Sequence, residues 1–175
     1  MHLLAKTRLL PKPTAYNALF ATLTEFNQAR EYVASVARSE PPNYGYWRQR
    51  DLYKATYEAL GARFDLGSQS RVLIINEIAG YAQRMEVHQA KFGPYDPILY
   101  DERVLSWQFD AQTVSIWTMQ GRKKGVPFEC GPRQREILAQ RRLVSELIYF
   151  NDEFYLFTQC RVNQVSSVDV EEVWK

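Results

Sequence analysis

Histidine and cysteine are scarce in this sequence, and their scarcity excludes several kinds of site. The 175 residues include two histidines, His2 and His88, and neither lies near Cys, Asp or Glu at the spacing of a metal site. The two cysteines, Cys130 and Cys160, lie far apart and form no CxxC motif. The sequence therefore predicts no zinc site, no disulfide framework and no histidine-dependent catalytic centre, and we expect buried free thiols in a reducing compartment.

Long apolar runs are also missing. No stretch approaches the ~20 apolar residues that a membrane-spanning helix needs, and the run at residues 3–5 is too short for a signal peptide. We therefore expect a cytoplasmic protein with no membrane contact. Because the sequence shows no nucleophile–base pair, phosphate-binding loop or metal cluster, we predict no cofactor and disfavour a metabolic enzyme. Hydrophobic residues still make up 46% of the chain, enough for the core of one compact domain or two small lobes.

Positive charge is concentrated in one stretch, residues 121–142. This stretch holds seven Lys or Arg residues against two Glu, a local charge of +5, whereas the whole chain carries +2. A basic stretch flanked by segments of alternating apolar residues suits a phosphate backbone. The alternative interpretation is an ordinary solvated surface loop.

The first half of the chain predicts one strand followed by three helices. Residues 3–10 read as a short strand, which Pro11 ends. Apolar residues at helical spacing then predict helices at residues 15–38, 46–60 and 68–92. Thr14 and Ser68 are residue types that cap helices, and we expect them to begin the first and third helix.

The period of the apolar pattern changes after residues 93–97. Strands are expected at residues 98–100, 104–109, 113–119, 126–130, 143–150 and 154–162, with a basic helix at 133–142. Together the elements predict an α+β fold, in which a small antiparallel β-barrel includes the first strand and the three helices are an insertion. Residues 164–175 are acidic and show no clear pattern.

Four residues at the start of the second predicted helix form a further candidate site. They are Tyr46, Trp47, Arg48 and Arg50. Aromatic rings interleaved with Arg can stack on bases or hold phosphates. The same residues can also pack a helix start against its neighbour, and the sequence leaves both interpretations open.

Several segments, taken in order along nearly the whole chain, resemble the TnpB family of insertion-sequence proteins, also called OrfB transposase-like. The segments are Arg8-Leu9-Leu10-Pro11-Lys12-Pro13, Leu52-Tyr53-Lys54-Ala55-Thr56-Tyr57, Tyr100-Asp101-Glu102-Arg103, Ser115-Ile116-Trp117-Thr118 and Glu146-Leu147-Ile148-Tyr149-Phe150. Lys12 and Ala15 depart from the pattern, since the family usually has Thr and Gln there.

The resemblance implies a layout for the chain. TnpB proteins are RNA-guided DNA endonucleases related to type V CRISPR effectors, with a wedge (OB-like) barrel interrupted by a helical recognition lobe. Residues 1–10 would be the first barrel strand, 11–93 the lobe, 94–163 the rest of the barrel, and 164–175 a linker towards a RuvC-like nuclease domain. Asp169 lacks the glycine that follows the family's catalytic Asp. We therefore assign no catalytic residue and expect this chain alone not to cut DNA.

Guide RNA and target DNA are the partners that the resemblance implies. The residues expected to contact RNA are Lys6, Arg8, Arg122, Lys123, Lys124, Arg133 and Arg135. Those expected to contact DNA or the guide–target heteroduplex are Tyr46, Trp47, Arg48 and Arg50. The alternative is a non-catalytic protein-interaction or regulatory module derived from a decayed transposon gene. Salt separates these hypotheses, because backbone contacts to RNA weaken steeply with ionic strength.

Overall fold

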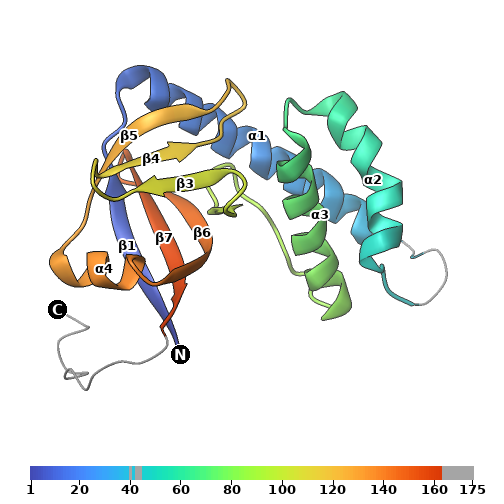
Figure 1. Cartoon of the computed structure of the whole chain (residues 1–175). Coiled ribbons are helices and arrows are strands. Elements are labelled where there is room, and N and C mark those ends of the chain that lie inside the picture. The colour runs from blue at the N-terminus through green and yellow to red at the C-terminus, as the bar shows by residue number, and fades with distance from the viewer. Residues whose placement is uncertain (40, 42–44, 163–175) are drawn as a thin grey trace.

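The structure, a computed structural model, describes residues 1–39, 41 and 45–162. Its seven strands form one antiparallel sheet that curls into a nearly closed barrel, with the order β2-β6-β7-β1-β5-β4-β3 (Figure 1). The strands are β1 (His2–Leu9), β2 (Ile98–Tyr100), β3 (Leu105–Gln108), β4 (Thr113–Ile116), β5 (Lys123–Glu129), β6 (Arg141–Phe150) and β7 (Glu153–Arg161). The predicted α+β barrel with inserted helices is confirmed.

The two end strands of the sheet, β2 and β3, are joined by a short bend of the chain rather than by strand pairing. Since every neighbouring pair in the sheet is antiparallel, β2 and β3 at its two ends run in the same direction. Tyr100 in β2 pairs with Ser145 of β6, while Leu105 in β3 pairs with Ile116 of β4. The chain between β2 and β3 therefore bends away from β6, and a seam stays open between β3 and the first residues of β6.

Alternation along β1 explains why this strand belongs to the barrel. Ala5, Thr7 and Leu9 point inward and are buried, whereas Lys6 is exposed. β1 pairs with β7 along its whole length and with β5 at its end, where Arg8 lies opposite Glu129. The first strand of the chain thus sits between two of the last strands, as the sequence pattern predicts.

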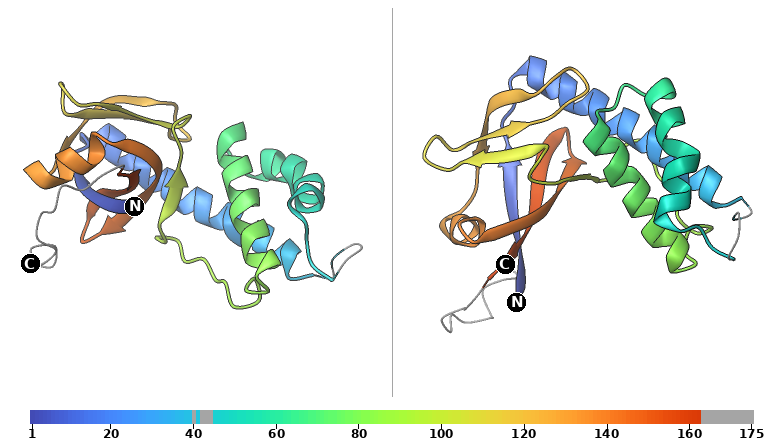
Figure 2. Two further views of the ribbon diagram at one scale, coloured as in Figure 1. Left: turned by 60° about the horizontal axis from the view of Figure 1, so that its bottom comes forward. Right: turned by 45° about the vertical axis from the view of Figure 1, so that its right-hand side comes forward.

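The chain leaves the barrel after β1, forms three helices, and returns to the barrel at β2. They are α1 (Pro13–Ala37), α2 (Gln49–Arg63) and α3 (Ser68–Gln83), and a short fourth helix, α4 (Pro132–Leu138), lies between β5 and β6. Figure 2 shows α1 running from the barrel into the lobe that α2 and α3 complete. The ring of Tyr16 near the start of α1 packs on Phe154 of the barrel, whereas Leu23 and Phe26 belong to a core shared with α3.

A buried polar network fixes the segment that returns the chain to the barrel. Arg30 is 5% exposed, and its guanidinium donates to the Asn27 side chain and the Pro97 carbonyl, both at 2.8 Å, and forms an ion pair with Glu77 of α3. Asn27 in turn donates to the carbonyl of Asp96 at 2.8 Å. The network therefore ties residues 96–97 to two helices just before β2 begins.

Several predicted helix boundaries are wrong. Thr14 does not cap α1, because Lys12 is the N-cap and Pro13 occupies the first helical position, where its missing N–H costs nothing. Ser68 is the first residue of α3 rather than its cap, which is Gly67. The third helix also ends at Gln83 rather than near residue 92.

The basic helix predicted at residues 133–142 is shorter than expected. α4 ends at Leu138, and Arg141 and Arg142 open the strand β6. Strand β5 begins at Lys123, three residues before the predicted start, so two of the basic residues lie within a strand. The predicted linker at 164–175, including Asp169, lies outside the described residues.

Candidate nucleic-acid interface

The turn between β4 and β5 carries the first group of predicted RNA contacts. Gly121 (φ +88°) and Gly125 (φ +66°) give this hairpin the left-handed backbone that its turn and bulge require. The Arg122 guanidinium donates to the carbonyls of Ser115 at 3.2 Å and Arg103 at 2.6 Å. It therefore anchors the hairpin to the neighbouring turn. Lys124 is exposed.

Lys123 completes this group and lies beside the backbone of the turn. Its ammonium donates to the Gln120 carbonyl at 3.3 Å, and the residue is only partly exposed. We define the hairpin group as Arg122, Lys123 and Lys124. Within it, the two lysines are the side chains that can turn towards a phosphate, because Arg122 already uses two donor directions inside the protein.

Lys6 and Arg8 form a second group on the outward face of β1. The Lys6 ammonium lies 4.7 Å from the centre of the Tyr155 ring, a cation–π distance. Arg8 is paired with Glu129 at 3.0 Å and with Glu153 at 2.5 Å. These two carboxylates neutralise much of its charge, so Lys6 is the stronger candidate for a phosphate contact.

The aromatic partner of Lys6 is held in its neutral form. The Tyr155 hydroxyl donates to a Glu153 carboxylate oxygen at 2.5 Å, and this hydrogen bond is the largest cause that raises the pKa of Tyr155. A neutral ring keeps its π face attractive to a cation or available to stack on a base.

The short helix α4 brings Arg133 and Arg135 close to this face. The Gln134 side chain accepts from the backbone N–H of Lys6 at 2.8 Å, which fixes α4 against β1. Both arginines are exposed, and the Arg135 guanidinium faces the amide of Gln112. We define the α4 group as Lys6, Arg133 and Arg135.

The hairpin group and the α4 group lie at opposite ends of the barrel. Lys123 begins β5 and Glu129 ends it, so at about 3.3 Å per residue the two ends are roughly 20 Å apart. Figure 1 shows α4 at the lower end of the barrel and the β4–β5 turn at the upper end. The structure thus divides the predicted RNA contacts into two groups instead of gathering them in one patch.

The predicted DNA-contact residues at the start of α2 differ in exposure. Trp47 is 8% exposed and belongs to the core, and its indole N–H donates to the Ser39 carbonyl at 3.3 Å. Trp47 therefore packs the helix start, which was one of its two interpretations. Tyr46 is 40% exposed, Arg48 is the N-cap of α2, and Arg50 is exposed in its first turn.

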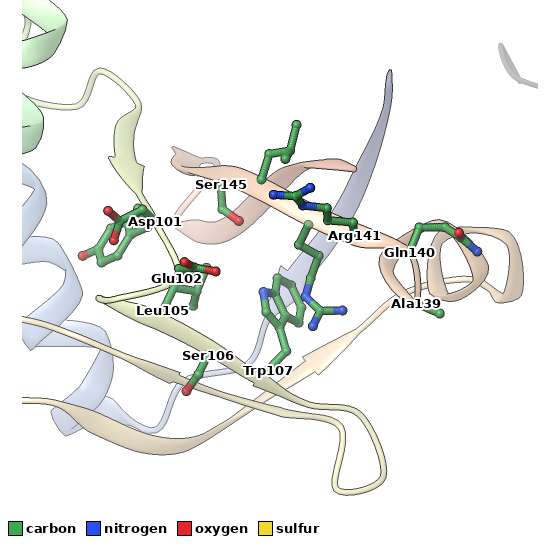
Figure 3. A pocket seen from close by; sticks show the side chains of 12 residues that line it. Asp101, Glu102, Leu105, Ser106, Trp107, Ala139, Gln140, Arg141 and Ser145 are labelled. Carbon is green, nitrogen blue, oxygen red and sulfur yellow. The ribbon is translucent and has the colours of Figure 1, made fainter. Parts of the chain in front are cut away.

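An open cavity at the seam was not predicted from the sequence. It measures about 470 Å³ and lies between the β2–β3 turn, β3 and the start of β6. In Figure 3, Asp101, Glu102 and Trp107 lie on one side of the cavity, and Arg141 and Ser145 lie on β6 across from them. In the sequence, the pair Arg141-Arg142 falls within the helix predicted at residues 133–142, so it gives no sign of a cavity beside a strand.

The comparisons with known proteins leave the family of this chain open: no family model and no curated protein matches its sequence. In the described part of the chain, no three His, Cys, Asp or Glu side chains gather as a metal site would require. Nor is any helix among these residues long and apolar enough to cross a membrane.

Proposed function

We propose that this chain is the nucleic-acid-binding portion of a TnpB-like RNA-guided DNA endonuclease, which holds a guide RNA scaffold and borders the target DNA. The observation that carries the proposal is topological. The helical lobe of α1–α3 is inserted into the barrel between β1 and β2, and this is the layout that the family resemblance implies. Base pairing would read the sequence of the target, so the protein needs mainly to grip backbone.

The exposed cations support a backbone grip. Lys124, Arg133 and Arg135 are exposed, and Lys6 adds a charge beside two aromatic rings of β7. Each phosphate neutralised by such a residue releases counterions, which favours binding at low ionic strength. The β4–β5 turn lies on the side of the barrel nearer the lobe and α4 lies on the far side (Figure 1), so one RNA scaffold would have to follow the barrel from end to end.

The direct test is RNA binding by the protein and by a variant that carries Lys123→Ala and Lys124→Ala. A structured RNA transcribed from beside the gene is compared with an unrelated RNA of equal length, over a series of salt concentrations. We expect selective binding by the wild type. In the variant, the negative slope of log K against log salt should be smaller in magnitude by about 1.5–2, because two phosphate contacts are lost. The matched control is Lys54→Ala in α2 with Lys91→Ala in the segment after α3. It removes the same charge from outside the barrel and should leave the scaffold slope nearer that of the wild type.

Weak and equal binding to both RNAs would overturn the proposal, provided that circular dichroism shows a folded protein. The same outcome would favour the second candidate function, a protein-interaction module. Leu4 is 57% exposed and Phe150 62% exposed, both on strands of the β1–β7–β6 part of the sheet, and exposed apolar side chains suit a protein partner. Self-association measured by sedimentation, insensitive to salt and lost in Phe150→Ser, would support that module.

A further inference from the structure

The seam cavity offers two uncommitted charged side chains that flank an aromatic ring. Asp101 is already engaged, since one carboxylate oxygen accepts from the Arg103 N–H at 3.0 Å and the other from Gln69 at 2.6 Å. Arg142 is also engaged, because it donates to the Leu138 carbonyl at 2.5 Å and lies over the Phe109 ring. Glu102 and Arg141 are exposed, and they line the cavity from opposite sides.

Trp107 forms an aromatic wall of the same cavity. Its ring is half-buried and rests on the core, stacked on Phe109 at 6.0 Å and edge-on to Phe128 at 5.1 Å. An indole supported in this way keeps a fixed orientation and loses little entropy when a ligand stacks on it. The Ser145 hydroxyl, which shares a hydrogen bond of 2.8 Å with the Thr158 hydroxyl, adds a polar group at the cavity wall.

We propose that the seam cavity binds one unpaired nucleotide with a guanine base, stacked on Trp107, its phosphate on Arg141 and its base edge on Glu102. The inference rests on the proposed nucleic-acid-binding function and adds a specific subsite to it. A cavity of about 470 Å³ lies within the size range of small-ligand sites. Unpaired bases splayed out of an RNA are commonly held by stacking and by hydrogen bonds to their edges.

The carboxylate selects the base. Ionised Glu102 only accepts hydrogen bonds, and guanine offers two adjacent donors, the ring N1–H and the exocyclic amino group. Uracil has a single ring N–H that lies between two carbonyl groups. The oxygens of these carbonyls repel a carboxylate. Arg141 contacts only the phosphate and does not distinguish bases. The site therefore predicts preference for guanine that depends on Glu102 and affinity that depends on Arg141.

The test uses guanosine 5′-monophosphate and uridine 5′-monophosphate with the full chain. Nuclear magnetic resonance follows the indole N–H signal of Trp107, which is identified by its loss in Trp107→Phe. We expect the guanine nucleotide to shift this signal and to bind about tenfold more tightly than the uracil nucleotide. Glu102→Gln should abolish the preference for the guanine nucleotide. Arg141→Ala should weaken the binding of both nucleotides by about tenfold.

Matched controls separate the site from general electrostatics. Arg161 lies opposite Arg141 in the β6–β7 register but outside the cavity, so Arg161→Ala should leave both affinities within about twofold of wild type. Glu136→Gln is the corresponding control for Glu102. An unshifted Trp107 signal, or an unchanged preference in Glu102→Gln, would overturn the inference. If the structured RNA still binds selectively in that case, the proposed function survives and only the nucleotide subsite is refuted.

Discussion

Replacing Arg30 by Met should destabilise the fold strongly, because Arg30 is the centre of the buried network that joins α1, α3 and the segment before β2. Arg30 is 5% exposed. The substitution keeps most of its apolar stem but removes the guanidinium, its hydrogen bonds at 2.8 Å to Asn27 and the Pro97 carbonyl, and its ion pair with Glu77. Removing one partner of a buried ion pair lowers the free energy of unfolding by about 3–5 kcal/mol. For a chain of this size, that loss lowers the melting temperature by about 6–20 °C.

The pH dependence of this loss follows from Glu77. Burial is the largest cause that raises the pKa of Glu77 above its ordinary value of 4.5, and the charge of Arg30 is the largest cause that lowers it. Without Arg30 the folded-state pKa rises further. A carboxyl with a raised folded pKa costs no stability below its unfolded pKa, and its penalty grows as pH rises through the folded value. The difference in the free energy of unfolding between the wild type and the Arg30→Met variant should therefore be larger at about pH 7 than at about pH 5.

Urea denaturation followed by circular dichroism at both pH values measures these differences. The control is Arg84→Met, since Arg84 and Glu86 form a solvent-exposed pair whose removal should cost about 0–1 kcal/mol. Replacing both charges, Arg30→Met with Glu77→Leu, should recover much of the loss, because no uncompensated charge remains. A cost for Arg30→Met below about 1 kcal/mol, or a cost that does not change with pH, would refute the role assigned to the network.

Three further predictions concern the barrel. Tyr100→Phe should lower the free energy of unfolding in urea by about 1–3 kcal/mol, because the buried hydroxyl donates to the Trp117 carbonyl at 3.0 Å; a neutral result would show that water or another donor replaces it. Burial raises the pKa of the Cys160 thiol, so a thiol reagent should modify the half-buried Cys130 in the native protein and Cys160 only on unfolding; equal rates would contradict this. Leu147→Ala, at a fully buried position, should cost about 2–5 kcal/mol, whereas Leu4→Ala at an exposed position should cost under about 0.5 kcal/mol in the same denaturation assay.

The architecture was predictable from the sequence because its two periods are clear. Apolar residues at helical spacing in α1 and strict alternation in β7 each bury one face of their element. The change of period after residues 93–97 marked the return to the barrel. What the pattern did not show was where α3 ends. The side chain of Arg38, the C-cap residue of α1, donates to the carbonyls of Val87 and Ala90 and holds that segment out of the helix.

The candidate site was less predictable than the fold, because local charge does not reveal which charges are paired. Arg8 and Arg122 look like free cations in the sequence, but Arg8 is held by two carboxylates and Arg122 by the carbonyls of Ser115 in β4 and Arg103 in the β2–β3 turn. In the sequence, Trp107 lies within a predicted strand and Glu102 just before it, and the pattern does not mark either as part of a site. They become a candidate site only because the bend between β2 and β3 opens a seam beside β6, and such a bend is a property of barrel closure rather than of any short segment.

The division of the basic residues has a consequence for the kind of nucleic acid that can use both groups. The hairpin group lies where β5 begins and the α4 group lies beyond the other end of that strand, so the roughly 20 Å length of β5 separates them, and β5 belongs to the same packed core as the lobe. At about 3.4 Å per nucleotide step along a duplex strand, bridging them takes about six steps. A shorter ligand can touch one group only, and its affinity should respond to variants of that group alone. A longer structured RNA should respond to both, and an unpaired guanine placed between its two contacts could reach the seam cavity.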